Sequence, residues 1–200
     1  MGFKDSSMME LVFASRNNNK IIELQEILGS AIKVRSLSEI GFDEDIVESA
    51  STIAGNSLLK AKCIYDKFKY NSISDDTGLE VEMLNGEPGV YSARYAGHNA
   101  NSDENIKKLL NNLSGKKNRK ACFKTVITLI IDGNVHQFEG IVNGTINSQI
   151  RGSNGFGYDS VFVPLGHEKT FAEMQSFEKN KISHRFLALK KTSDFISGIV

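Results

Sequence analysis

The stretch SISDDTGLEV, residues 72–81, sets two neighbouring carboxylates at the end of a short alternating strand. Its first three residues alternate as a half-buried strand does, and Asp75 and Asp76 follow directly. Strand interiors disfavour aspartate, and neighbouring like charges repel each other. Because successive strand side chains point to opposite faces of a sheet, we predict that one acid faces a cleft and the other joins a structural hydrogen-bond network.

This acidic pair favours a functional role over a simple turn. An Asx-type turn, with Gly78 at the bend, needs only one aspartate. A carboxylate that lies in a cleft beside phosphates favours a divalent cation, because Mg²⁺ takes hard oxygen ligands and often only one or two of them from protein. The pair is therefore a candidate for a magnesium site.

Outward from this stretch, hydrophobic periodicity predicts strands that alternate with helices early in the chain and strands in hairpins later. Strands are predicted over 11–14, 32–35, 72–75, 79–84, 121–131, 135–142, 145–150 and 161–164. Helices are predicted over 20–28, 52–68, 103–113 and 183–199. This order predicts an α/β fold with a mixed sheet, helices outside it and two lobes.

The composition excludes several classes of protein. The 200 residues contain 24 basic and 24 acidic side chains, so no overall field attracts nucleic acid or an acidic membrane. Cys63 and Cys122 lack the spacing of a zinc site or a disulfide framework, which fits a reducing cytoplasm. No apolar run approaches the roughly 18 residues of a membrane span. We expect residues 1–8 to form a flexible extension and residues 9–200 to form a single domain.

The segment SRNNNK, residues 15–20, lies between a predicted strand and a predicted helix. A helix N-terminus presents free N–H groups and the positive end of the helix dipole, which suits an anion. Ser15 adds a hydroxyl group and Lys20 adds a charge. A capped helix with an exposed lysine is the alternative, and this segment alone favours that alternative because most such turns bind nothing.

The segment NGFGYD, residues 154–159, sets two glycines around a phenylalanine. Glycine allows a backbone to approach a ligand closely. Phe156 offers a face for stacking and Asp159 offers a hydrogen-bond acceptor. The alternative, a tight loop with Phe156 plugged into the core, has equal weight because phenylalanine is commonly buried.

The segment EKNKISHR, residues 178–185, gathers basic side chains. Ser183 is predicted to be an N-cap, which places His184 and Arg185 in the first turn of the last helix. Basic residues there oppose the helix dipole, and chains tolerate this when an anionic or electron-rich group lies nearby. A solvated basic patch is the alternative.

Taken together with GVYSARYAG, residues 89–97, these four segments resemble the inosine triphosphate pyrophosphatase family over residues 11–189. The resemblance implies Mg²⁺-dependent hydrolysis of noncanonical purine nucleoside triphosphates (ITP, dITP and XTP) to the monophosphate and pyrophosphate. It also implies an elongated mixed β-sheet flanked by helices, with two lobes around a central substrate cleft, and a homodimer. The family commonly has Glu-Asn-Ala where this chain has Gly-Asn-Ser at 55–57, which puts the local helix geometry in question.

The resemblance also implies roles for individual residues. Those expected to bind the triphosphate are Ser15, Arg16, Asn17, Asn18, Asn19, Lys20 and Lys60. Those expected around the base and phosphates are Thr77, Phe156, Gly157, Tyr158, Asp159, Lys179, His184 and Arg185. Asp76 is expected to be the general base and a metal ligand, with Glu48 as a second metal ligand.

The expected mechanism uses Asp76 to hold Mg²⁺ and to orient water toward the α-phosphorus, while Asp75 holds the strand end. A nearby cation is expected to keep the pKa of Asp76 low. Arg185 would donate to the 6-oxygen of hypoxanthine or xanthine and Asp159 would accept from N1–H, so adenine would leave both unpaired at roughly 1–3 kcal/mol each.

Other functions stay open at this point. One is a related pyrophosphatase that acts on modified pyrimidines or on ordinary triphosphates such as ATP. Another is a nucleotide-binding sensor without turnover. Nucleic-acid binding is disfavoured because the net charge is zero and no basic stripe is present.

Overall fold

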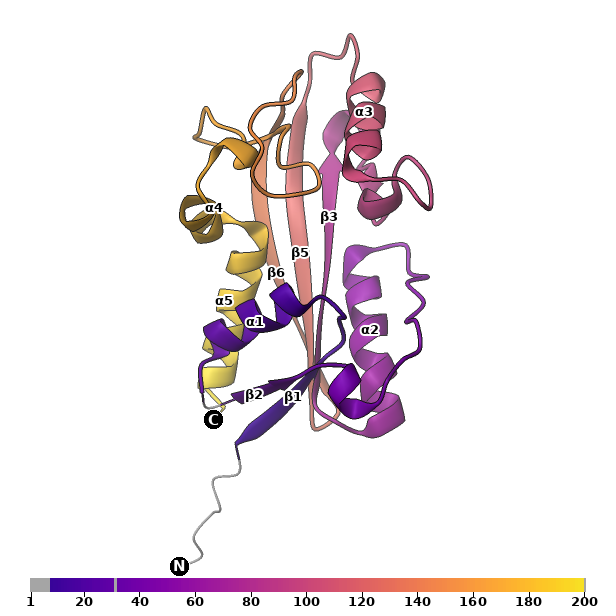
Figure 1. The fold of residues 1–200 in the computed structure, drawn as a ribbon, viewed down its shortest axis with the longest axis vertical. Helices are drawn as coiled ribbons and strands as arrows, with labels where there is room; N and C mark the ends of the chain where they lie inside the picture. The colour runs from indigo at the N-terminus through magenta and orange to yellow at the C-terminus, as the bar shows by residue number, and fades with distance from the viewer. Residues whose placement is uncertain (1–7, 31, 200) are drawn as a thin grey trace, which may run out of the picture.

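The computed structural model describes residues 8–30 and 32–199, apart from the side chain of Asn19, so residues 1–7 of the predicted extension lie outside the described residues. One open mixed sheet forms the centre (Figure 1). Its strands are β1 (Met9–Phe13), β2 (Ile32–Arg35), β3 (Ser72–Val81), β4 (Pro88–Gly89), β5 (Lys120–Ile131), β6 (Asn134–Ile146) and β7 (Phe162–Pro164). The helices are α1 (Asn18–Leu28), α2 (Ile53–Phe68), α3 (Ser102–Asn112), α4 (Ser176–Ile182) and α5 (His184–Ser197). This confirms the predicted α/β class, and no helix of this described part is long and apolar enough to cross a membrane.

The strand order creates a natural ligand position at the end of β1. The order is β2-β1-β3-β5-β6-β7, with β1, β2 and β3 parallel and the remaining pairs antiparallel. The chain leaves β1 on one side through α1 to β2, and reaches β3 on the other side through α2. These two helices therefore cover opposite faces of the sheet, as Figure 1 shows. Ligands of open α/β sheets bind at such a switch point, outside the carboxyl ends of the strands.

Strand β3 passes through both halves of the molecule in unbroken register with β5, from Ser72 opposite Ile130 to Val81 opposite Ala121. One face of β3 therefore carries Ile73 in the core formed with α1 and α5. Farther along the same face, Leu79 lies in a second core, formed with α3. Two cores on one long sheet give the two predicted lobes, and the face between them is where a cleft can open.

Two strand predictions are wrong in their extent. The segments 72–75 and 79–84 form the single strand β3, and 135–142 and 145–150 form β6, which ends at Ile146. The glycine at 78 does not bend β3. A Cβ there would lie 2.5 Å from the carbonyl oxygen of Gly89, so the glycine allows β4 to pair closely. Helix α4 and the short strand β4 were not predicted.

The start of α2 is intact despite the glycine at 55. Thr52 is the N-cap, and its Oγ1 accepts a hydrogen bond of 3.0 Å from the Gly55 N–H. A Cβ on Gly55 would lie 2.6 Å from the Cβ of Ala50. The glycine therefore makes room for the preceding loop, and the helix geometry questioned from the sequence is regular.

A glycine on β6 lets α5 approach the sheet. A Cβ on Gly140 would collide with the His184 carbonyl oxygen and would lie 2.5 Å from the Ala188 nitrogen. The first turn of α5 therefore rests directly on the β6 backbone, and this contact fixes the position of the SHR segment.

We expect Gly140→Ala to lower the free energy of unfolding by about 1–3 kcal/mol, because the first turn of α5 must move away from β6. Urea denaturation measures this change. The control is Glu139→Ala, whose side chain is exposed on the opposite face of β6 and which should change stability by less than about 0.5 kcal/mol. Equal stability of the Gly140→Ala variant and the wild type would contradict the close packing described above.

Candidate active site

A cavity of about 250 Å³ lies at the carboxyl end of β1, at the switch point of the sheet. Side chains from α1, α2, β3 and the acidic loop before α2 meet around it. The charged members of its lining are Arg16, Lys20, Glu44, Asp45, Glu48, Lys60 and Asp75. The cavity is therefore a highly charged pocket built from both faces of the sheet.

The loop between β1 and α1 is held by its own side chains. Ser15 Oγ accepts the Asn17 N–H at 3.2 Å, and Asn17 Oδ1 accepts the Lys20 N–H at 3.3 Å. Arg16 turns away to the acidic loop, where it donates to the carbonyl oxygens of Asp43 and Glu44. The capped turn thus directs the Lys20 side chain toward β3.

Asp75 joins three elements of the fold on one face of β3. Its Oδ2 lies 2.8 Å from Lys20 Nζ on α1 and 2.6 Å from Arg185 Nη1 on α5. The side chain is 3% exposed. Burial alone would raise the pKa of the Asp75 carboxyl, but Lys20 and Arg185 outweigh it and hold the pKa well below the usual value.

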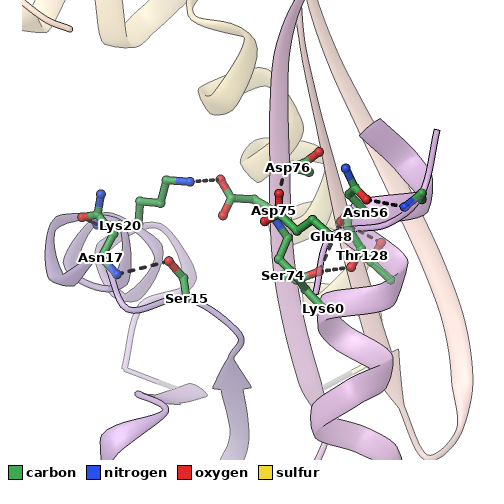
Figure 2. Close-up of polar contacts among 12 residues, drawn as sticks. Ser15, Asn17, Lys20, Glu48, Asn56, Lys60, Ser74, Asp75, Asp76 and Thr128 are labelled. Atoms are coloured by element: carbon green, nitrogen blue, oxygen red, sulfur yellow. Dashed lines mark hydrogen bonds and ion pairs between the residues drawn. The ribbon is translucent and has the colours of Figure 1, made fainter. Parts of the chain in front are cut away.

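Asp76 makes its contacts on the other side of β3, as Figure 2 shows. Its Oδ1 lies 2.9 Å from Lys60 Nζ on α2, and the same ammonium group lies 2.9 Å from Glu48 Oε1. Burial raises the pKa of the Asp76 carboxyl above its usual value, against the attraction of Lys60. Burial alone would lower the pKa of Lys60, but attraction by Asp76 and Glu48 outweighs it, so that pKa is raised too. The predicted opposite orientation of the two acids is confirmed.

Glu48 and Asp76 are the carboxylates that could hold a cation together. Both point at one position, now taken by the ammonium group of Lys60. No group of three or more histidine, cysteine or acidic side chains in the described ranges could hold a metal ion by itself. Two carboxylates suit Mg²⁺, which commonly takes one or two protein carboxylates and completes its shell with water and phosphate.

A second cavity, of about 480 Å³, opens on the same face of the sheet as Asp75, between the two lobes. Lys20 lines both cavities, so they adjoin. The members of its lining that come from the predicted site are Lys20, Thr77, Phe156, Gly157, Tyr158, Asp159, Lys179, His184 and Arg185. Leu79 and Phe123 add apolar surface, so this pocket is far less charged than the first.

The loop at 154–159 presents its phenylalanine to solvent. Phe156 is 82% exposed, so the alternative of a core plug is wrong. Lys179 Nζ lies 5.2 Å from the Phe156 ring centroid and forms an ion pair with Asp159. Asp159, itself buried, also accepts the Phe156 N–H at 2.9 Å. Tyr158 is buried and donates to the Ser92 carbonyl oxygen. The loop is thus anchored beneath an exposed aromatic ring.

Helix α5 begins as predicted. Ser183 Oγ accepts the Phe186 N–H at 3.1 Å, which places His184 and Arg185 in the first turn. The His184 ring stacks on Phe123 with centroids 4.6 Å apart. Burial, with the positive charge of Lys179, lowers the pKa of His184 to about 3, so its ring is neutral at physiological pH.

The structure brings most predicted residues together, with some exceptions. Asn17, Asn18 and Asp76 line neither of these two cavities, and of the two neighbouring acids it is Asp75 that lines one. The Asn19 side chain lies outside the described part of the chain. Lys20 and Arg185 pair with Asp75, whereas Asp76 pairs with Lys60 on the other face of β3.

Sequence reasoning missed several residues around the cavities. It gave Asp75 only a structural role, yet Asp75 lines the charged cavity. It missed Glu23, whose Oε2 lies 2.7 Å from Arg185 Nε. It also assigned no role to Ser92, Asn101 and Asn105, which line the larger cavity. The segment at 89–97 was the available signal for Ser92, whereas nothing local marks the two asparagines.

The protein is an α/β protein with an open mixed sheet, and a charged cavity adjoins a cavity with aromatic lining at the switch point of that sheet. Such a site suits a ligand that has an anionic part and a planar part. A family-level comparison narrows this class. The Ham1 family profile matches residues 11–195, so this chain belongs to the Ham1 family. The family resemblance inferred from the sequence motifs is confirmed.

Individual relatives are similar to this chain in sequence over nearly its whole length. A Flavobacterium psychrophilum protein named dITP/XTP pyrophosphatase is 52% identical over 190 residues, which cover 95% of this chain and 100% of that protein. A Porphyromonas gingivalis protein of the same name is 51% identical over 94% of this chain and 98% of its own length. The solved structure of the Staphylococcus aureus Ham1 protein matches with a TM-score of 0.92 and 40% identity, over 96% of this chain and 100% of that one.

We expect the free energy of unfolding to fall as the pH is lowered from about 6.5, the usual pKa of histidine. The unfolded chain then binds a proton at His184, whereas the folded protein does not until about pH 3, so acid favours the unfolded state. At about pH 5 the difference amounts to about 2 kcal/mol. Urea denaturation of the wild type and of His184→Gln at about pH 7.5 and about pH 5 tests this, and the wild type should lose more stability. The same pH dependence in both proteins would refute it.

Proposed function

We propose that this chain hydrolyses the noncanonical purine nucleoside triphosphates ITP, dITP and XTP to the nucleoside monophosphate and pyrophosphate. One observation carries the proposal: Lys20 lines both a charged cavity and an aromatic one, so a single nucleotide can occupy the two together. The names of the Flavobacterium and Porphyromonas relatives support it. This activity would remove damaged purine nucleotides from the nucleotide pool.

The triphosphate belongs in the smaller cavity in this proposal. Lys20 and Lys60 line it with their ammonium groups, and Ser15 adds a hydroxyl group. Phosphoryl transfer depends mainly on positioning and on neutralising negative charge, which these groups provide. Each lysine would exchange its carboxylate partner for a phosphate oxygen when substrate binds.

Asp76 and Glu48 would hold Mg²⁺. The bound ion would neutralise charge on the phosphates and help pyrophosphate to leave. Asp76 would orient the attacking water and accept its proton. Burial raises the pKa of Asp76 when no cation is bound, and a cation beside the carboxylate would lower that pKa, as expected from the sequence.

The purine belongs in the larger cavity. Phe156 at its mouth would stack on the base, with Gly157 and Thr77 beside it. Arg185 is held by Asp75 and Glu23 and would donate to the 6-oxygen. Asp159 would accept from N1–H, and the neutral ring of His184 would lie beside the base. Adenine presents the opposite donor and acceptor pattern and would leave these groups unpaired.

Residues 9–200 would act as one domain, in the cytoplasm, and as a homodimer. Support for the dimer comes from the sheet face beyond α2. Tyr91 and Leu165 are exposed there and line two cavities that both contain Glu80, and Ile141 is exposed on β6. Exposed apolar groups gathered on one face mark interaction sites.

We expect pyrophosphate release from ITP, dITP and XTP with Mg²⁺ to be much faster than release from ATP, because the base pocket matches a 6-oxygen and an N1–H and adenine presents the opposite pattern. GTP shares both groups, so slower release from GTP would come from its 2-amino group. A coupled pyrophosphate assay on this panel, with EDTA as the control, measures it. Equal rates with ATP would indicate a pyrophosphatase of broad specificity. Binding without release would indicate a sensor.

We expect Asp76→Asn to lower kcat by about 100-fold or more, because the amide cannot accept a proton and is a poorer ligand for Mg²⁺. Asp66→Asn, on the exposed side of α2, makes the same change of charge and should leave kcat unaltered. Circular dichroism checks that both variants fold. A kcat close to that of the wild type in Asp76→Asn would remove Asp76 from the proposed mechanism.

A further inference from the structure

We propose that Lys60 occupies the position of the divalent cation between Glu48 and Asp76 while no nucleotide is bound, so that the cation binds well only together with the nucleotide. This inference rests on the proposed cation site at the same two carboxylates. It adds an order of binding and assigns Lys60 a role before substrate arrives.

The contacts of Lys60 carry the inference. Its Nζ lies 2.9 Å from Glu48 Oε1 and 2.9 Å from Asp76 Oδ1. The Lys60 side chain is 12% exposed and that of Asp76 is 13% exposed. The ammonium group therefore bridges a loop and a strand in a largely dry position, and both carboxylates face the same positive charge.

A divalent cation and this ammonium group compete for the same oxygen atoms. Mg²⁺ binds carboxylate oxygens at about 2.0–2.1 Å and requires a near-ideal octahedral arrangement. Two positive groups that close together repel strongly in a partly buried site. Lys60 must therefore leave at least one of its two carboxylates before the cation can bind both.

A nucleotide gives Lys60 another partner. Lys60 lines the charged cavity with Ser15, Arg16 and Lys20, where the triphosphate is proposed to bind. The flexible stem of a lysine lets its ammonium group turn from a carboxylate to a phosphate. Phosphate binding then frees Glu48 and Asp76. Because coupling between two ligands is reciprocal, the cation strengthens nucleotide binding by the same factor.

Lys20 differs from Lys60 in a way that provides a control. It pairs with Asp75, which keeps Arg185 as a second partner when Lys20 leaves. Lys20 lies in the same charged cavity but does not bridge the two proposed cation ligands. Removing its charge therefore changes the field of the site without opening the position between Glu48 and Asp76.

The test measures Mn²⁺ binding to the nucleotide-free protein, with electron paramagnetic resonance to quantify the free ion. We expect Lys60→Met to bind Mn²⁺ at least about 10-fold more tightly than the wild type, and Lys20→Met to gain much less. Equal gains in the two variants would mean a long-range effect of charge and would overturn the inference.

Activity measurements separate the failure of this inference from that of the proposed function. No gain for Lys60→Met, alongside metal-dependent pyrophosphate release by the wild type, would overturn the inference alone. Absence of metal-dependent release by the wild type would overturn both.

A measurement on the wild type does not depend on the folding of a variant. Acetylation of lysines by acetic anhydride, read by mass spectrometry, reports whether an amine is free. We expect Lys60 to react slowly without ligands and faster at a Mn²⁺ concentration that saturates the site, while Lys20 keeps its rate. An unchanged Lys60 rate with the site saturated would show that the lysine and the cation coexist, against the inference.

Discussion

The whole site depends on strand β3, which continues past the end of its neighbour β1 and whose side chains alternate between the two faces of the sheet. Strand β1 stops at Phe13, whereas β3 runs on to Val81, so the edge of β3 is open where Asp75 and Asp76 lie. Alternation sends one carboxylate to each face. Helices α1 and α2, which the topology places on opposite faces, then reach the two acids from opposite sides with one lysine each. The alternation of side chains along β3 thus produces two separate sets of ion pairs, one at Asp75 and one at Asp76.

These two systems give the same chemical group different properties. Asp75 is almost fully buried between Lys20 and Arg185, and this double pairing keeps it ionised. Asp76 shares its lysine with Glu48, so attraction offsets burial less completely and its pKa rises. Paired carboxylates with divergent pKa values often divide structural and chemical work. In this protein Asp75 ties three elements together, and the proposed function assigns the chemical role to Asp76.

Much of the fold could be predicted from local sequence patterns, but most of the ion pairs between charged side chains in the site could not. Helical period and the Ser183 cap located α2 and α5, since these signals are contained in a few adjacent residues. Strand β3 was predicted as two pieces because Gly78 was taken as a possible bend, whereas this glycine allows close pairing with β4. The partners of Asp75 lie 55 and 110 residues away in the chain. No local pattern encodes such contacts, so the motifs named the residues without showing which lysine meets which acid.

The hairpin between β5 and β6 has a consequence far from its turn. Asp132 and Gly133 both adopt positive φ, as a two-residue turn requires, and they set Ile131 opposite Asn134. That register brings Gly140 under the carbonyl oxygen of His184. A slip of one residue would put a bulky side chain there instead and would lift the histidine and arginine off the sheet. The placement of His184 and Arg185, which line the larger cavity, is therefore tied to an exposed turn that does not line that cavity.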